Sequence, residues 1–85
     1  MLEKEWIIRG IPDWVLREYL EKLGGQENPD GGFSGNGWQA NITRLADEPR
    51  HSLVFQCYRV VINGDPGTVS QVWKGFELRI LRPGG

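Results

Sequence analysis

The chain has 85 residues, 39% hydrophobic and 25% charged, which suits one small globular domain and is too short for two. Ten Lys and Arg are scattered among eleven Asp and Glu, and the net charge of −1 argues against a nucleic-acid-binding protein with a basic patch. The first residues lack the apolar run of a signal peptide, and no stretch suits a membrane span, so we expect a cytoplasmic protein without a membrane role.

The first predicted elements are a strand and a helix. Residues 4–9 are rich in aromatic and β-branched side chains, which favour a strand. Pro12 and Asp13 suit a helix start, because proline has no amide hydrogen to lose there and a carboxylate favours the positive helix end. Gly24 and Gly25 are typical of a helix end. Apolar residues between them recur at helical spacing and predict a buried stripe of Leu16, Tyr19, Leu20 and Leu23.

A glycine-rich segment and a regular strand follow. Residues 26–37 include four glycines and predict turns, with Asn36-Gly37 suited to a tight hairpin after a short strand at 32–34. From position 38 to 43, apolar and polar residues alternate, which predicts a strand with one buried and one polar face. The predicted buried residues are Trp38, Ala40 and Ile42, and the predicted polar residues are Gln39, Asn41 and Thr43.

The run from 51 to 63 is strand-like, but its alternation changes phase. One face carries Leu53, Phe55 and Cys57, and the other carries Tyr58, Val60 and Ile62. We expect both sets in the core, and therefore a bulge or a break into two strands near Gln56–Tyr58.

The last predicted element is a helix over 69–81, stopped by Pro83. Thr68 and Gln71 have the spacing of a capping box. The apolar residues Val69, Val72, Trp73, Phe76 and Ile80 then follow at helical intervals. Gly75 disfavours a helix by roughly 1 kcal/mol, so a final strand is the alternative.

These elements predict a single α+β domain spanning residues 1–85. Because strands and helices do not alternate regularly, we expect one curved antiparallel sheet with both helices on one face. The other face is open. In the predicted register it carries Gln39, Asn41, Thr43 and Arg59, with Ile7 and Val61 as apolar members.

The segment RGIPDWVLREYLEKLGG resembles the small domain that follows the molybdopterin-synthase small-subunit-like module in MoaD-related proteins. The shared positions are Pro12, Trp14, Leu16, Tyr19, Leu20, Glu21, Gly24 and Gly25. The later hairpin and strands keep the same order, so the resemblance covers most of the chain. It implies a TBP-like fold of order β-α-β(4)-α and a setting near molybdenum-cofactor or sulfur-carrier chemistry. These 85 residues do not include the ubiquitin-like module of the fused proteins, which weakens a role inferred from the fusion.

No residues form a recognisable catalytic or metal site. His51 is the only histidine and Cys57 the only cysteine, and six residues along one strand would separate them by about 20 Å. One His, one Cys and scattered carboxylates give no zinc spacing. Residues 28–31 lack the twelve-residue calcium pattern, and residues 32–35 lack the lysine of a phosphate loop. We therefore expect no enzyme activity, no metal and no cofactor.

The leading hypothesis is a non-enzymatic accessory or binding module with a protein partner. Its binding surface would be the open sheet face, made by Gln39, Asn41, Thr43 and Arg59. Trp14 falls on the polar side of the first helix and is predicted as a second contact, since aromatic residues are frequent anchors at interfaces. An edge strand also offers a route to a homodimer, but the sequence does not define the oligomeric state.

The alternative is a small carrier protein that acts through the carboxylate of Gly84-Gly85. A tail without side chains can pass through a narrow channel to the ATP of an activating enzyme. Termini are commonly disordered, however, and a Gly-Gly pair is a weak signal in a chain with twelve glycines. Carriers with the ubiquitin-like β-grasp fold also begin with a β-hairpin, whereas one strand is predicted here before the first helix.

Overall fold

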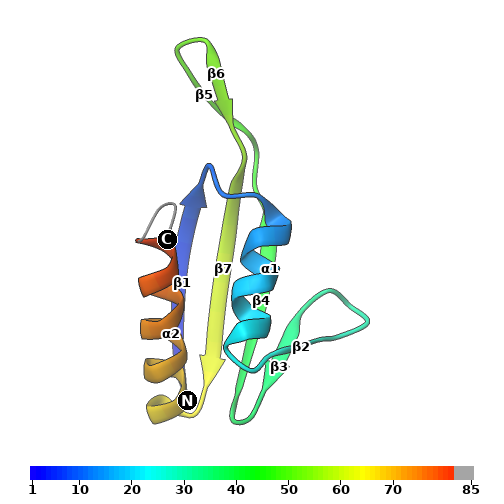
Figure 1. The fold of residues 1–85 in the computed structure, drawn as a ribbon, viewed down its shortest axis with the longest axis vertical. Helices are drawn as coiled ribbons and strands as arrows, with labels where there is room; N and C mark the ends of the chain where they lie inside the picture. The colour runs from blue at the N-terminus through cyan, green and yellow to red at the C-terminus, as the bar shows by residue number, and fades with distance from the viewer. Residues whose placement is uncertain (82–85) are drawn as a thin grey trace.

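Two helices and seven strands make up the described part of the chain. The computed structural model describes residues 1–81, except for the side chains of Glu48 and Arg50. The elements are β1 (Leu2–Arg9), α1 (Asp13–Lys22), β2 (Gln26–Glu27), β3 (Phe33–Gly35), β4 (Trp38–Arg44), β5 (Glu48–Arg50), β6 (Leu53–Phe55), β7 (Cys57–Gly64) and α2 (Pro66–Ile80). Both helices cover the same face of the sheet in Figure 1. The predicted α+β class is confirmed.

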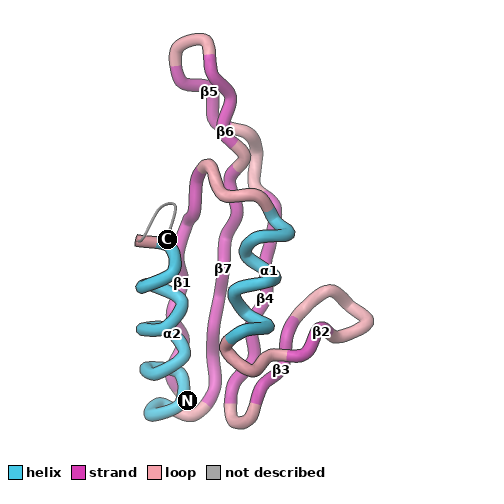
Figure 2. Tube along the Cα trace, viewed as in Figure 1, coloured by secondary structure: helices cyan, strands magenta, loops and turns pink. Residues whose placement is uncertain are grey.

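The main sheet is open and antiparallel, with five strands in the order β1-β7-β4-β3-β2. Strand β7 is central and pairs along its length with β1 on one side and β4 on the other. Strands β5 and β6 pair with each other as a separate two-stranded sheet. This hairpin projects beyond the end of the main sheet (Figure 2). The finer assignment to a TBP-like fold stays a prediction.

The core lies between the helices and the sheet face that they cover. Helix α1 contributes Leu16 and Leu20, as the predicted stripe requires. The central strands contribute Trp38, Ala40, Tyr58, Val60 and Ile62, and α2 contributes Val69, Val72 and Phe76. Trp6 and Trp73 stack beside this core with ring centroids 5.4 Å apart. The predicted alternation of β4 is confirmed, because its polar members are exposed on the opposite face.

Helix α1 ends at the predicted glycines. Leu23 is the C-cap of the helix. Gly24 follows with φ of 100°, a left-handed conformation that is strained for residues with a side chain. The amide of Gly25 then donates to the carbonyl of Leu20 at 3.0 Å. These bonds satisfy the end of the helix and turn the chain toward β2.

Helix α2 is present, as predicted, but begins three residues early. Its N-cap is Asp65, whose Oδ2 accepts hydrogen bonds from the amide and the hydroxyl of Thr68, both at 3.2 Å. The predicted capping box of Thr68 with Gln71 is therefore wrong. Pro66 occupies the first helical position, where its missing amide hydrogen costs nothing. The predicted stop at Pro83 lies outside the described residues.

The prediction for residues 51–63 is right about the break and wrong about Leu53. Strand β6 ends at Phe55 and β7 begins at Cys57, so Gln56 separates them. Cys57 is buried, but Leu53 and Val54 are 61% and 64% exposed. Alternation predicts burial only where a second layer covers the strand, and neither helix reaches the hairpin in Figure 1.

Candidate functional site

The candidate site is the sheet face that the helices leave uncovered, which we call the open face. Residues paired across antiparallel strands point to the same side, so the strand register defines its rows. The first row contains Glu3, Asn63, Gln39, Ser34 and Gln26. The second contains Glu5, Val61 and Asn41, and the third contains Ile7, Arg59 and Thr43.

The four residues predicted for this face lie together on it. Gln39, Asn41 and Thr43 follow one another on the exposed side of β4, and Arg59 of β7 is the cross-strand partner of Thr43. The apolar members Ile7 and Val61 also lie where the alternation predicted. Sequence reasoning therefore placed these side chains on the same face, while their role in binding stays a prediction.

Four polar side chains in the middle of the open face are available for hydrogen bonds. The side chains of Gln39, Asn41, Thr43 and Asn63 form no hydrogen bond within residues 1–81. Each amide can donate and accept, and so can the hydroxyl. The exposed side chains of β4 and the half-buried Asn63 of β7 can thus exchange hydrogen bonds with the backbone of a bound segment.

Arg59 and Glu5 form an ion pair on this face. The Nε of Arg59 lies 2.8 Å from Oε1 of Glu5, and its Nη2 donates to Oε2 at 3.0 Å. This two-point contact fixes the guanidinium. Because the side chains are 48% and 42% exposed, the pair contributes little to stability. The charge of Arg59 is matched by a neighbour, so Arg59 is a poor site for a free anion.

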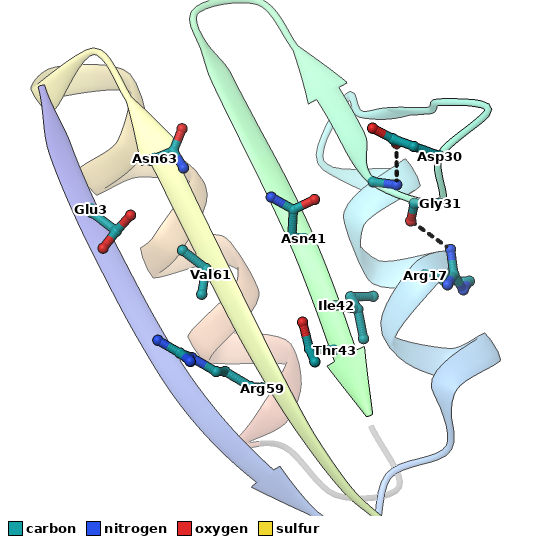
Figure 3. Close-up of a pocket in the computed structure, with 11 residues that line it drawn as sticks. Glu3, Arg17, Asp30, Gly31, Asn41, Ile42, Thr43, Arg59, Val61 and Asn63 are labelled. Atoms are coloured by element: carbon teal, nitrogen blue, oxygen red, sulfur yellow. Dashed lines mark hydrogen bonds between the residues drawn. The ribbon is translucent and has the colours of Figure 1, made fainter. Parts of the chain in front are cut away.

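A hollow of about 510 Å³ deepens the open face along β4 (Figure 3). Strands β1 and β7 supply one side of it, with Glu3 and Asn63. The loop of residues 28–32 supplies the other. Gly32 lies so close to β4 that a Cβ at this position would be 2.7 Å from Oδ1 of Asn41. A side chain at this position would have to displace the amide of Asn41 and would come within 3.1 Å of the carbonyl of Ala40.

One hydrogen bond within the loop shapes it, and another ties it to α1. The amide of Gly32 donates to Oδ1 of Asp30 at 2.9 Å, and Nη1 of Arg17 donates to the carbonyl of Gly31 at 3.0 Å. Both are drawn as dashed lines in Figure 3. Because Arg17 belongs to α1, the helix layer fixes the wall of a hollow that opens on the other side of the sheet.

The electrostatics around Arg17 favour its charged form. Its Nε lies 2.9 Å from Oδ2 of Asp13, and its Nη1 lies 3.2 Å from Oε2 of Glu27. The hydrogen bond with Asp13 raises the pKa of Arg17; partial burial opposes this effect, and the charges of Asp13 and Glu27 add to it. The guanidinium also lies 5.8 Å from the ring centroid of Phe33. Arg17 is therefore a structural cation that two carboxylates neutralise.

Trp14, the predicted second contact, is not part of the open face. Its side chain is 67% exposed in the first turn of α1. The same helix packs Leu16 and Leu20 against the sheet, and at about 100° per residue Trp14 points roughly the opposite way. A partner that contacts both Trp14 and the open face would have to reach around the molecule.

The other candidate residues are not brought together. His51 is exposed in the turn between β5 and β6, with φ of 58°, and Cys57 is buried at the start of β7. No three His, Cys, Asp or Glu among the described residues are placed to hold a metal ion. No helix within residues 1–81 is long and apolar enough to cross a membrane. The predicted carrier tail, Gly84-Gly85, lies outside the described residues.

Sequence reasoning missed four acidic or amide residues of this site. Glu3 and Glu5 follow from the alternation of β1 once Ile7 is placed on the open face, and Asn63 follows from Val61 on β7. Asp30 had no such signal, because its loop takes its position from contacts with α1 and β4.

Comparison with known protein families gives a match. The model of a protein family described as archaeal MoaD-like protein matches residues 4–85, which is nearly the whole chain. No curated protein matches the chain.

Proposed function

The chain belongs to the archaeal MoaD-like protein family, and from this membership we propose that it is a non-enzymatic module that binds a protein partner in sulfur-carrier or molybdopterin-synthase-related chemistry. The observation that carries the proposal is the open face: its central amide and hydroxyl groups are exposed and in register, and they form no hydrogen bond within residues 1–81. The contact residues are Gln39, Asn41 and Thr43, flanked by Arg59.

The dimensions of the open face suit a weak, transient contact. Seven residues of β4 extend over about 24 Å, and five strands about 4.8 Å apart span roughly 20–24 Å. The face therefore offers on the order of 500 Å², below the roughly 800 Å² per partner of a typical stable complex. An accessory protein that joins and leaves an assembly needs such an interface. Trp14 provides a separate anchor for a partner that wraps around α1.

The test is capture of partners from the native host. A variant that combines Gln39→Ala, Asn41→Ala and Thr43→Ala removes the central polar groups and leaves the core intact. We expect it to recover at least ten-fold less of the partner than the wild type, because several hydrogen bonds of about 1 kcal/mol each are lost. The matched control, Ser70→Ala with Gln71→Ala on the exposed side of α2, should capture normally. Equal recovery by the triple variant would refute the role of the open face.

A second candidate function is the carrier role of the Gly84-Gly85 carboxylate. The family match extends through these two residues, which favours a function for the tail. The fold supports the binding module instead, because within residues 1–81 β1 alone precedes α1, whereas a β-grasp carrier has a hairpin there. Intact mass of the protein from its host, purified with thiols preserved, separates the two. Sulfur in place of a C-terminal oxygen supports the carrier, and loss of all function on deletion of Gly84 and Gly85 would do the same.

A further inference from the structure

The hollow is lined by two guanidinium groups, Arg17 and Arg59, and by two carboxylates. The ion-pair partners of the two arginines add three more carboxylates, so the lining and these partners together carry a net charge of −3. The carboxylates are Glu3, Glu5, Asp13, Glu27 and Asp30. Net charge of the whole chain, −1, does not reveal this local excess.

The excess is concentrated on two carboxylates. Glu5 is paired with Arg59, and Arg17 is shared by Asp13 and Glu27. Within the part of the chain that the structure describes, Glu3 and Asp30 have no ion-pair partner. They line opposite sides of the hollow: Figure 3 shows Glu3 on β1 and Asp30 in the loop beyond β4.

The separation of these two carboxylates sets a length scale. The distance from β1, across β7 and β4, to the loop beside β4 is three strand spacings, or about 14 Å. An extended segment advances about 3.3 Å per residue, so four residues cover about 13 Å, and residues four apart point to the same side. Between the two carboxylates the segment would cross Asn63 and Asn41, whose amides can bind its backbone.

We propose that the open face binds an extended basic segment of its partner, with two Lys or Arg side chains four residues apart that pair with Glu3 and Asp30. This inference rests on the proposed function and specifies the chemistry of the partner. The same charges disfavour nucleic acid and anionic lipid, which would meet two carboxylates that no cation within residues 1–81 pairs with.

The inference is tested with synthetic nine-residue peptides and amide-resolved NMR titration of the 85-residue protein. The first peptide carries two lysines four residues apart in a Ser, Thr and Val background. The second carries the lysines two residues apart, and the third replaces them with glutamates. We expect the first peptide to shift the side-chain amide signals of Gln39, Asn41 and Asn63 at low salt. The effect should weaken in about 0.5 M salt, because exposed ion pairs are screened.

A charge variant identifies the two carboxylates. Glu3→Gln with Asp30→Asn keeps the shape of each side chain, and asparagine can still accept from the amide of Gly32. We expect about five-fold weaker binding of the first peptide, the effect of two exposed ion pairs. The control, Glu18→Gln with Asp47→Asn, removes the same charge from carboxylates on α1 and beside Arg44, and should bind within two-fold of the wild type.

The outcomes separate this inference from the proposed function. Stronger binding of the first peptide, lost in the Glu3 and Asp30 variant, supports both. If the glutamate peptide shifts the same amides equally, or if the charge variant binds like its control, the basic-segment inference is overturned and the open face remains a binding surface. If no peptide shifts these amides and the alanine variant of the open face still captures its partner, both are overturned.

Discussion

Substitution of Gly35 by alanine should destabilise this fold more than the same substitution at Gly31 or Gly67. Gly35 pairs with Trp38 across the β3–β4 hairpin, and the indole of Trp38 lies directly over it. A Cβ at position 35 would overlap the indole Nε1 and Cε2 and lie 2.7 Å from Cζ2. The ring cannot move away freely, because it is buried and its far edge contacts Gly25.

The magnitude follows from the two ways in which the protein can respond. If the core yields slightly, the cost is that of overpacking, about 1–3 kcal/mol. If the indole leaves the core, the cost approaches that of losing a large aromatic side chain, about 3–5 kcal/mol. We therefore expect a decrease of about 2–4 kcal/mol in the free energy of unfolding, or about 10–25 °C in Tm for a domain of this size.

Urea unfolding followed by far-UV circular dichroism measures the effect, with the two other glycines as controls. At Gly31, φ is 91° and nothing lies within 4 Å of a new Cβ, so alanine should cost about 1 kcal/mol from backbone strain alone. Gly67, in the first turn of α2, has ordinary φ and space, so alanine there should change stability by less than about 1 kcal/mol. A Gly35→Ala protein within about 0.5 kcal/mol of the wild type would refute the packing argument.

Three further predictions concern single contacts, each measured by the same unfolding assay. Asp65→Ala removes the N-cap of α2 and should cost about 1 kcal/mol, whereas Asp65→Asn, which keeps an accepting oxygen, should cost less. Leu53→Ser together with Val54→Ser should change stability by no more than about 0.5 kcal/mol per residue, and a larger loss would show that the β5–β6 hairpin is packed. Arg17→Ala should cost about 1–2 kcal/mol and speed amide exchange at Gly32, because the loop loses its link to α1.

Local patterns predicted most of the secondary structure, because each depended on residues close in sequence. The stripe of Leu16 and Leu20 and the left-handed Gly24 identify α1 and its end without knowledge of the rest of the fold. The same reasoning failed at Leu53, where the pattern of a buried strand occurs in a hairpin that no second layer covers. At the start of α2 both Asp65 and Thr68 can act as an N-cap. In the structure the N-cap is Asp65, directly before Pro66.

The candidate site was predictable where alternation defines it and not where tertiary contacts do. Asn41 and Thr43 on β4 and Arg59 on β7 were placed on one face by parity alone. The hollow depends on the loop of residues 28–32, which folds against β4 because of glycine at position 32 and the reach of Arg17 from another layer. No periodicity in the sequence encodes that approach.

Exposure of a polar sheet face does not by itself indicate binding, because antiparallel sheets commonly leave one face in water. An unpaired surface carboxylate is not unusual either, because Glu21 and Glu77 on the helices also form no ion pair within residues 1–81. Glu3 and Asp30 differ from these in their position, because they lie on opposite sides of one hollow, and within residues 1–81 no cation pairs with either. The two carboxylates are about 14 Å apart, which is close to the distance between side chains four residues apart in an extended chain. A basic partner should therefore lose more affinity when these two carboxylates are neutralised than when any other pair is.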